Sequence, residues 1–245
     1  MKKKTSAFSY HKADPAKQGK KCVVIYSGGK DGHLALAQAV EDKAVIQCLM
    51  TIDGGARHPA YFHDLRKVEI LKVHAALMGI PLFIYKAPAG FSPKKGPAEL
   101  VKILSKLGKK YSFKTIYSGA SDYDEGGNAA QFKKVFKTAG FTTVAPFASK
   151  NVAELIKECE LRGIKAVIVA VEKNVDKAWL GARLDKKFAA YIAKQAREGA
   201  GIDGNCFQTL VLESPLMKKR IEILKTSILA KKTTTFLKIN KFALR

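Results

Sequence analysis

The stretch Cys22-Val23-Val24-Ile25-Tyr26-Ser27-Gly28-Gly29-Lys30-Asp31-Gly32-His33 decides the fold of this 245-residue chain. Residues 22–26 form a short apolar run with β-branched side chains that ends at glycines, a pattern typical of a buried strand. Residues 33–41 are rich in helix-forming side chains. The stretch therefore predicts a strand that leads through a glycine turn into a helix.

The same alternation continues to about residue 140. Apolar runs predict strands over 44–52, 80–85 and 115–117, and helical periodicity predicts helices over 61–78, 97–108 and 129–139. Strands separated by helices of this length indicate right-handed β-α-β units and a parallel sheet. We therefore predict an α/β nucleotide-binding domain over residues 21–148, preceded by a flexible basic tail, residues 1–20.

The second half of the chain has a different order of elements. The sequence predicts helices over 152–162 and 185–197, strands over 166–171 and 209–212, and a terminal hairpin of 219–230 and 233–242. Residues 149–245 are therefore expected to form a smaller C-terminal α+β domain that ends in a hairpin. We assign substrate binding to this domain.

The glycine turn carries groups that suit a polyphosphate. Adjacent Gly28 and Gly29 allow backbone N–H groups to line one concave site, and the N-terminus of the following helix points at the same place. Ser27 adds a hydroxyl and Lys30 a positive charge. The turn matches neither Gly-x-x-x-x-Gly-Lys-Ser/Thr nor Gly-x-Gly-x-x-Gly. The alternative is a tight strand-to-helix turn without a ligand.

The turn resembles the Ser-Gly-Gly-x-Asp-Ser signature of the PP-loop ATP pyrophosphatases, with Gly32 in place of the last serine. The resemblance implies a HUP-like fold and cleavage of ATP between its α and β phosphates. We assign catalysis to Lys30, which adds positive charge nearby, and to Asp31, which would hold Mg²⁺. The ATP-binding residues would be Ser27, Gly28, Gly29, Lys30, Asp31, Gly32 and Asp53.

From residue 21 to about 215 the chain is similar to the diphthine–ammonia ligase family. The loop is the first similar segment, and the others are Tyr61-Phe62-His63 with Gly79-Ile80-Pro81-Leu82, Tyr117-Ser118-Gly119 with Ser121-Asp122-Tyr123, and 165–169 with Trp179-Leu180-Gly181-Ala182-Arg183-Leu184-Asp185. The resemblance implies a substrate site with His63, Gly119, Asp122 and Tyr123. A helix cap is the alternative role for His63.

One segment departs from the family. Where the family has Gly-Glu-x-Gly-Glu-Tyr-His-Thr, this chain has Asp203-Gly204-Asn205-Cys206-Phe207-Gln208-Thr209, and 124–127 replaces an expected arginine. Asp203 and Cys206 stand for the two glutamates, and Gln208 stands for the histidine. We assign Asp203, Gln208 and Thr209 to the substrate, so ATP use carries over from the family while the identity of the acceptor does not.

The resemblance implies that a substrate carboxylate attacks ATP, releasing pyrophosphate, and that ammonia then displaces AMP to give an amide. The family's acceptor is diphthine on translation elongation factor two. Two alternatives remain. A tRNA-directed PP-loop enzyme would use the same ATP chemistry, although the chain has no C-x-x-C pair for thiolation. A non-catalytic regulator would hold an adenine nucleotide without turnover.

The formal net charge of +23 is concentrated at the two ends. Residues 2–21 hold seven lysines against Asp14, and residues 218–245 hold nine Lys or Arg against Glu222. Such ends can follow a phosphate backbone, but no RNA-reading motif accompanies them, so we favour a solvated face over RNA binding. The spacing of the cysteines fits neither a disulfide framework nor a metal site, and we find no secretory signal and no apolar span. These observations indicate a cytoplasmic protein away from membranes. The sequence does not decide between a monomer and a homodimer.

Overall fold

The structure is a computed structural model that describes residues 19–53, 68–86, 96–120, 128–200, 202 and 204–245. Most of the predicted tail lies outside the described residues. So do four predicted site residues, namely His63, Asp122, Tyr123 and Asp203. Within the described part, no helix is both long and apolar enough to cross a membrane.

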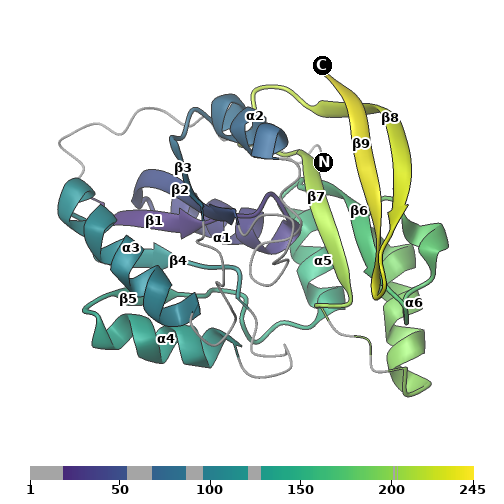
Figure 1. Ribbon diagram of the computed structural model, residues 1–245, viewed down its shortest axis with the longest axis horizontal. Helices are drawn as coiled ribbons and strands as arrows, with labels where there is room; N and C mark the ends of the chain where they lie inside the picture. Colours follow the sequence, from purple (N-terminus) through teal and green to yellow (C-terminus); the bar gives the residue numbers. More distant parts are fainter. Residues whose placement is uncertain (1–18, 54–67, 87–95, 121–127, 201, 203) are drawn as a thin grey trace, which may run out of the picture.

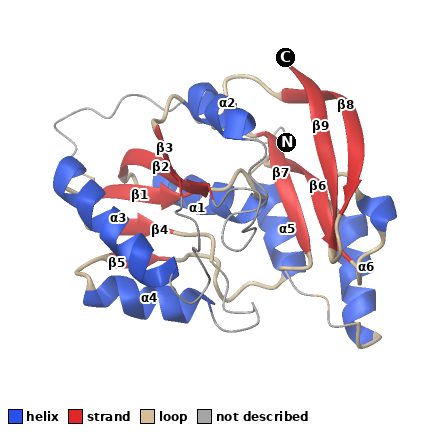
Figure 2. Cartoon of the chain, in the orientation of Figure 1, coloured by secondary structure: helices blue, strands red, loops and turns tan. Residues whose placement is uncertain are grey.

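The first half forms the predicted parallel sheet (Figures 1 and 2). Its order is β3-β2-β1-β4-β5, and every described pairing is parallel. The strands are β1 (Lys21–Ile25), β2 (Val45–Asp53), β3 (Leu82–Lys86), β4 (Thr115–Tyr117) and β5 (Thr142–Val144). The helices are α1 (Lys30–Glu41), α2 (Val68–Met78), α3 (Gly96–Tyr111) and α4 (Asn128–Thr138).

Two differences from the sequence prediction concern α1 and β5. Helix α1 begins at Lys30, so that Lys30, Asp31 and Gly32 form its first turn, where the carboxylate of Asp31 favours the positive end of the helix. Strand β5 was not predicted at all. It has three residues, of which two are threonines, and it lies at the edge of the sheet.

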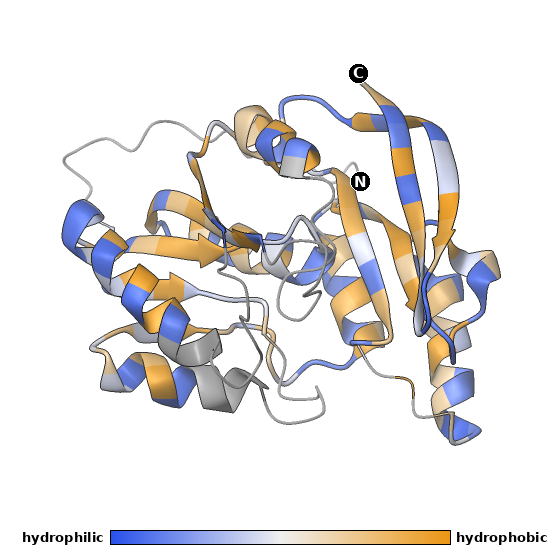
Figure 3. Cartoon of the chain, viewed as in Figure 1, coloured by the Kyte–Doolittle hydropathy of each residue, from blue (hydrophilic) through white to orange (hydrophobic). Residues whose placement is uncertain are grey.

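Alternate side chains of the central strand β1 face two apolar clusters. Cys22 and Val24 belong to the cluster that contains α1 and α2, whereas Val23 and Ile25 belong to the cluster with α3 and α4. Apart from the exposed Lys21 at its start, the strand is therefore hydrophobic, as Figure 3 shows. Burial on both faces explains why this stretch has no polar alternation.

The second half forms the predicted α+β unit with an antiparallel sheet of order β7-β6-β9-β8. The terminal hairpin of β8 and β9 is confirmed. The elements are α5 (Val152–Leu161), β6 (Lys165–Glu172), a 3-10 helix η1 (Lys177–Trp179), α6 (Lys186–Arg197), β7 (Phe207–Glu213), β8 (Ile221–Ala230) and β9 (Thr234–Leu244).

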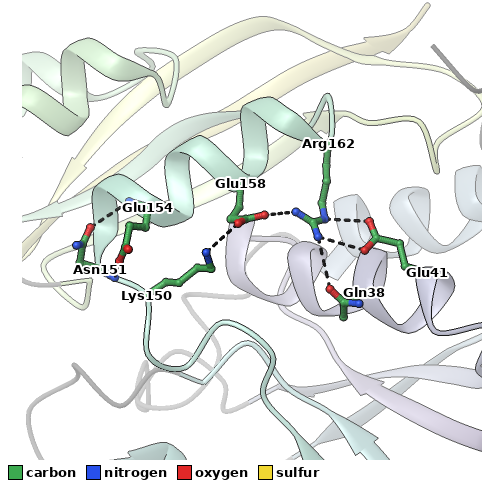
Figure 4. Close-up of polar contacts among 7 residues, drawn as sticks. All are labelled: Gln38, Glu41, Lys150, Asn151, Glu154, Glu158 and Arg162. Atoms are coloured by element: carbon green, nitrogen blue, oxygen red, sulfur yellow. Dashed lines mark hydrogen bonds and ion pairs between the residues drawn. The ribbon is translucent and has the colours of Figure 1, made fainter. Parts of the chain in front are cut away.

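The two halves share one apolar cluster, which contains Leu34 of α1, Ile156 of α5 and Val211 of β7. Arg162 joins the same helices by polar contacts (Figure 4). Its guanidinium donates to both carboxylate oxygens of Glu41, at 3.1 Å each, and also to Glu158. The end of α1 is therefore bound to the end of α5 by polar contacts. The predicted division of the chain into two domains at residue 148 stays a prediction.

Candidate phosphate-binding site

The predicted loop lies where the order of the sheet changes direction. Strand β1 lies between β2 and β4, and the chain adds strands first on one side of β1 and then on the other. Parallel sheets bind ligands at such a switch point, beyond the carboxyl ends of the strands. The segments after β1 and β4 meet here. A Cβ on Gly119 would lie 2.3 Å from the carbonyl carbon of Asp31, so Gly119 packs directly on the loop.

The two glycines of the loop have different roles. Gly28 has φ +80°, and a Cβ there would lie 2.7 Å from Leu71 Cδ2 of α2. Any side chain at Gly28 would therefore strain the backbone and clash. Gly29 is the N-cap of α1 and has φ −82°, a conformation open to other residues, and as a glycine it has no side chain of its own to cap the helix. A substitution at Gly29 consequently tests the space in the loop without imposing backbone strain.

The first turn of α1 presents amide groups to the site. The N–H of Lys30 donates to Thr209 Oγ1 at 3.0 Å. Within the described part of the chain, no group accepts a hydrogen bond from the N–H of Asp31 or of Gly32. Unpaired N–H groups at a helix N-terminus carry partial positive charge and favour an anion. The geometry therefore suits the phosphates that the sequence predicted.

Strand β7 of the C-terminal half holds the loop in place. Besides the Thr209 contact, the N–H of Val211 donates to the carbonyl of Gly28 at 2.9 Å. Strand β7 is at the edge of its sheet, so its outer side is open to the loop. Thr209, which the sequence assigned to the substrate, thus lies against the phosphate loop itself. Gln208 is half-buried and points to the opposite side of β7.

Lys30 and Asp31 form an ion pair at the start of the helix. Lys30 Nζ lies 2.8 Å from Asp31 Oδ2 and 4.9 Å from the centre of the Phe207 ring. The lysine side chain is 3% exposed and the aspartate side chain 35%. The ammonium is therefore directed to Asp31 and the aromatic ring, while the carboxylate reaches solvent. Among the described residues, no group of three or more His, Cys, Asp or Glu is placed to hold a metal ion.

A buried polar network that the sequence did not predict lies beside the loop. The Tyr26 hydroxyl lies 3.0 Å from His33 Nδ1 and 2.8 Å from His74 Nδ1, and His33 Nε2 lies 2.8 Å from Ser214 Oγ. The hydroxyl has one proton, so it donates to one histidine and accepts from the other. Among the described residues, His74 Nε2 has no hydrogen-bond partner of normal geometry. These hydrogen bonds link the residue that follows β1 to α1, to α2 and to the segment after β7.

Burial determines the charge of the two histidines and the tyrosine in this hydrogen-bond network. It lowers the pKa of His33 to about 3, with a contribution from neighbouring His74, and it lowers the pKa of His74 to about 4, partly opposed by the Val211 backbone. It also raises the pKa of Tyr26 above its ordinary range. All three groups are therefore neutral near pH 7. The signal in the sequence was a histidine within each of two otherwise apolar helix faces.

The structure brings most of the described site residues to one place. Ser27 to Gly32, Gly119 and Thr209 are adjacent, and Asp53 ends β2 at the same carboxyl edge of the sheet. Gln208 is next to them in sequence, on β7. A parallel sheet with a glycine loop and a helix N-terminus at its switch point, and with a small antiparallel unit beside it, defines an α/β protein of the PP-loop ATP-binding class.

The family models agree with this class. The sequence matches the diphthamide synthase N-terminal domain over residues 20–142 and the diphthamide synthase C-terminal domain over residues 150–244. The chain therefore belongs to the diphthamide synthase family, and it is a PP-loop enzyme that uses ATP. The comparison with curated proteins found no match.

Two solved structures are similar in fold. One is described as a predicted subunit of tRNA methyltransferase from Methanocaldococcus jannaschii, with 14% identity, a TM-score of 0.44, and coverage of 79% of this chain and 97% of that chain. The other is a U34-tRNA thiolase from Methanococcus maripaludis with its 4Fe–4S cluster. It has 14% identity, a TM-score of 0.43, and coverage of 59% of this chain and 57% of that chain.

Proposed function

We propose that this protein is an ATP-dependent amide-forming ligase that adenylates a carboxylate and then amidates it with ammonia. The observation that carries the proposal is membership of the diphthamide synthase family in both halves of the chain. It is supported by the contact between the phosphate loop and β7, because a substrate held by the C-terminal half would then lie close to the phosphates.

The reaction proceeds in two displacements. A carboxylate oxygen attacks the α-phosphorus of ATP, the bond to the bridging oxygen breaks, and pyrophosphate leaves. Ammonia then attacks the carbonyl carbon of the acyl-adenylate, AMP leaves with the former carboxylate oxygen, and the nitrogen loses a proton. Activation is needed because hydroxide is a poor leaving group and AMP a good one. The protein supplies position and fixed dipoles.

Each group in the loop has a place in this scheme. The Ser27 hydroxyl and the amides of Gly28, Gly29, Asp31 and Gly32 would bind the phosphates that leave, while the Lys30 amide is held by Thr209. Asp31 would hold Mg²⁺, which neutralises phosphate charge when bound, and one carboxylate suffices because Mg²⁺ takes its other ligands from phosphates and water. Lys30 would hold the Asp31 carboxylate in position through their ion pair and place a positive charge near the phosphates. Asp53 is proposed to contact the rest of the nucleotide.

The acceptor site is proposed to lie between the loop and the C-terminal half. Gly119 belongs to it, together with His63, Asp122, Tyr123 and Asp203, which lie outside the described residues. Gln208, which the sequence assigned to the acceptor, points to the side of β7 opposite Thr209 and would have to contact the acceptor from that side. The family implies diphthine on translation elongation factor two as acceptor. Cys206 and Gln208 replace family residues that would face the acceptor. Other carboxylic acids should therefore also be tried as acceptors in the experiment below. A cytoplasmic location would suit a protein acceptor of this kind.

Isotope transfer tests the proposal. The protein is incubated with ATP, Mg²⁺, ammonium and elongation factor two whose diphthine carboxylate is labelled with ¹⁸O. The expected products are pyrophosphate and AMP with one ¹⁸O atom in its phosphate. ADP and orthophosphate would instead place the protein with the kinases or ordinary ATPases. AMP formation only with tRNA would favour an RNA-modifying enzyme, and ATP binding without product would favour the regulator.

Gly29→Val provides the matched inactive variant. The backbone at Gly29 accepts a branched residue, so the protein should fold, but the side chain would occupy the space of the phosphates. We expect ATP binding to be lost in calorimetry while the urea midpoint changes little. Undiminished ATP binding by this variant would show that the loop is not the nucleotide site.

A further inference from the structure

The hairpin of β8 and β9 concentrates positive charge at one end of the molecule. Residues 218–245 contain nine Lys or Arg and one acidic residue, Glu222. That residue is already paired, since Arg245 Nε donates to its carboxylate at 2.7 Å. Figure 1 shows the two strands side by side at the margin of the fold, with β8 at the edge of the sheet.

The register of the hairpin gathers three lysines on one face. Lys225 is directly opposite Lys241, and Ser227 is directly opposite Lys238. The register shifts on both sides of Lys225, and Asn240 is skipped in the pairing. Cross-strand partners still point to the same side, and so do Lys225 and Ser227, which are two apart in β8. Asn240 joins this face because its Nδ2 donates to Ser227 Oγ at 3.0 Å. All five side chains are exposed, and we call them the lysine face.

The lysine face lacks the acidic partners that lysines have on the helices. Lys72 pairs with Glu69, Lys102 with Glu99 and Lys194 with Glu198. In contrast, no ion pair among the described residues includes any lysine of the lysine face. Like charges directly opposite one another destabilise a hairpin. An anion bound across the two strands would remove this repulsion.

The chemistry of the face discriminates among anionic partners. A second copy of the chain would bring the same excess of positive charge and be repelled. A protein partner would need apolar or aromatic anchors at the centre of the contact, and the lysine face has none. Contacts to phosphodiesters need only cations and hydroxyl or amide donors, which this face supplies. In place of the solvated face that the sequence favoured, we propose that the lysine face binds the phosphodiester backbone of a nucleic acid without reading its sequence.

Two triple variants of the full chain test the proposal. One carries Lys225→Gln, Lys238→Gln and Lys241→Gln. The matched control carries glutamine at the three helix lysines that pair with glutamates, so both proteins have the same net charge. Fluorescence anisotropy measures binding of labelled oligouridine RNA, and of DNA of the same length, from about 50 to 200 mM salt. Binding of ATP reports that each variant is folded.

We expect the hairpin variant to bind at least tenfold more weakly at low salt, and its salt slope to flatten by about 2, since each single-strand phosphate contact contributes about 0.7. The control variant should keep the parent's slope. If RNA and DNA bind with different affinities, the one that binds more tightly is the nucleic acid that the lysine face recognises. Lys225→Gln alone should weaken nucleic-acid binding and yet raise the urea midpoint, because it removes the opposed lysine pair.

Three outcomes would overturn the proposal. Equal weakening in both triple variants would mean that net charge alone attracts the nucleic acid. An unchanged slope in the hairpin variant would mean that the lysine face does not touch phosphates. Displacement of the RNA by a poly-glutamate peptide at equal charge concentration would identify an acidic protein as the partner. None of these results depends on ligase activity, so they are separate from the isotope test.

Discussion

Thr209→Val removes the hydrogen bond through which the C-terminal half fixes the phosphate loop. Thr209 Oγ1 is the acceptor for the N–H of Lys30 at 3.0 Å, and both residues are buried. Valine has nearly the same shape but no acceptor. A buried donor without a partner costs about 1 to 3 kcal/mol, so the free energy of unfolding should fall by about that amount.

The same loss should weaken ATP binding. Without the bond, the loop leaves its binding geometry in part of the molecules, and the apparent Kd rises as the reciprocal of the competent fraction. A cost of about 1 to 2 kcal/mol corresponds to roughly 5- to 30-fold weaker binding. Calorimetry with the methylene analogue of ATP that resists cleavage between the α and β phosphates, with Mg²⁺ present, measures this directly. Urea unfolding gives the stability.

Two control variants make the measurement specific. Thr209→Ser keeps the hydroxyl and should restore most of the affinity. Thr235→Val removes another buried threonine hydroxyl, on β9, which is separated from β7 by β6. It should leave ATP binding unchanged. If Thr209→Val binds the analogue as tightly as the parent, or if the serine variant binds as weakly as the valine variant, then the hydroxyl does not position the loop.

Three other perturbations test neighbouring parts of the structure. The pKa values near 3 and 4 of His33 and His74 lie below the ordinary 6.5, so acid favours the unfolded state, which takes up the protons. Stability should fall as pH drops from about 6.5 toward 4, by about 2 kcal/mol per histidine at pH 5, and His74→Leu should halve that loss in urea titrations. At Gly32, a Cβ would lie only 3.3 Å from the backbone carbonyl oxygen of Ile25, so Gly32→Ser requires the loop backbone to shift by a few tenths of an ångström. The added hydroxyl is a donor for phosphate, so the variant should still bind ATP a few-fold more tightly in calorimetry; weaker binding would contradict this. Arg162→Ala should lower the free energy of unfolding by about 1 to 2 kcal/mol and spare ATP affinity, and an unchanged urea midpoint would show that its contact with Glu41 is not stabilising.

The fold was largely predictable because its signals are local. Strand β1 is buried on both faces, so its sequence is a continuous apolar run, and the glycines that follow mark the turn into α1. Strand β5 escaped prediction for the opposite reason. Its three residues Thr142–Val144 form an edge of the sheet, and neither hydrophobic periodicity nor length distinguishes such a segment from a loop.

The site was predictable only where its residues are contiguous. The proposed phosphate loop could be predicted because its residues, Ser27 to Gly32, are neighbours in the sequence. In contrast, the contact of Lys30 with Thr209 joins residues 179 apart, and that of His33 with Ser214 joins residues 181 apart. No local pattern determines such pairs, because they depend on how β7 packs beside α1.

These long-range contacts determine how the two halves of the protein can move. Helix α1 is held at its start through Thr209, in its first turn by His33 and Ser214, and at its end by Glu41 and Arg162. The helix cannot rotate against the C-terminal half without breaking the first two hydrogen bonds, which are buried and cost about 1 to 3 kcal/mol each, and the exposed Glu41–Arg162 ion pair, which contributes less. The phosphate loop and the C-terminal half therefore move as one body. An acceptor bound to that half would stay in register with the α-phosphorus through both displacements, which is the condition under which positioning accelerates them.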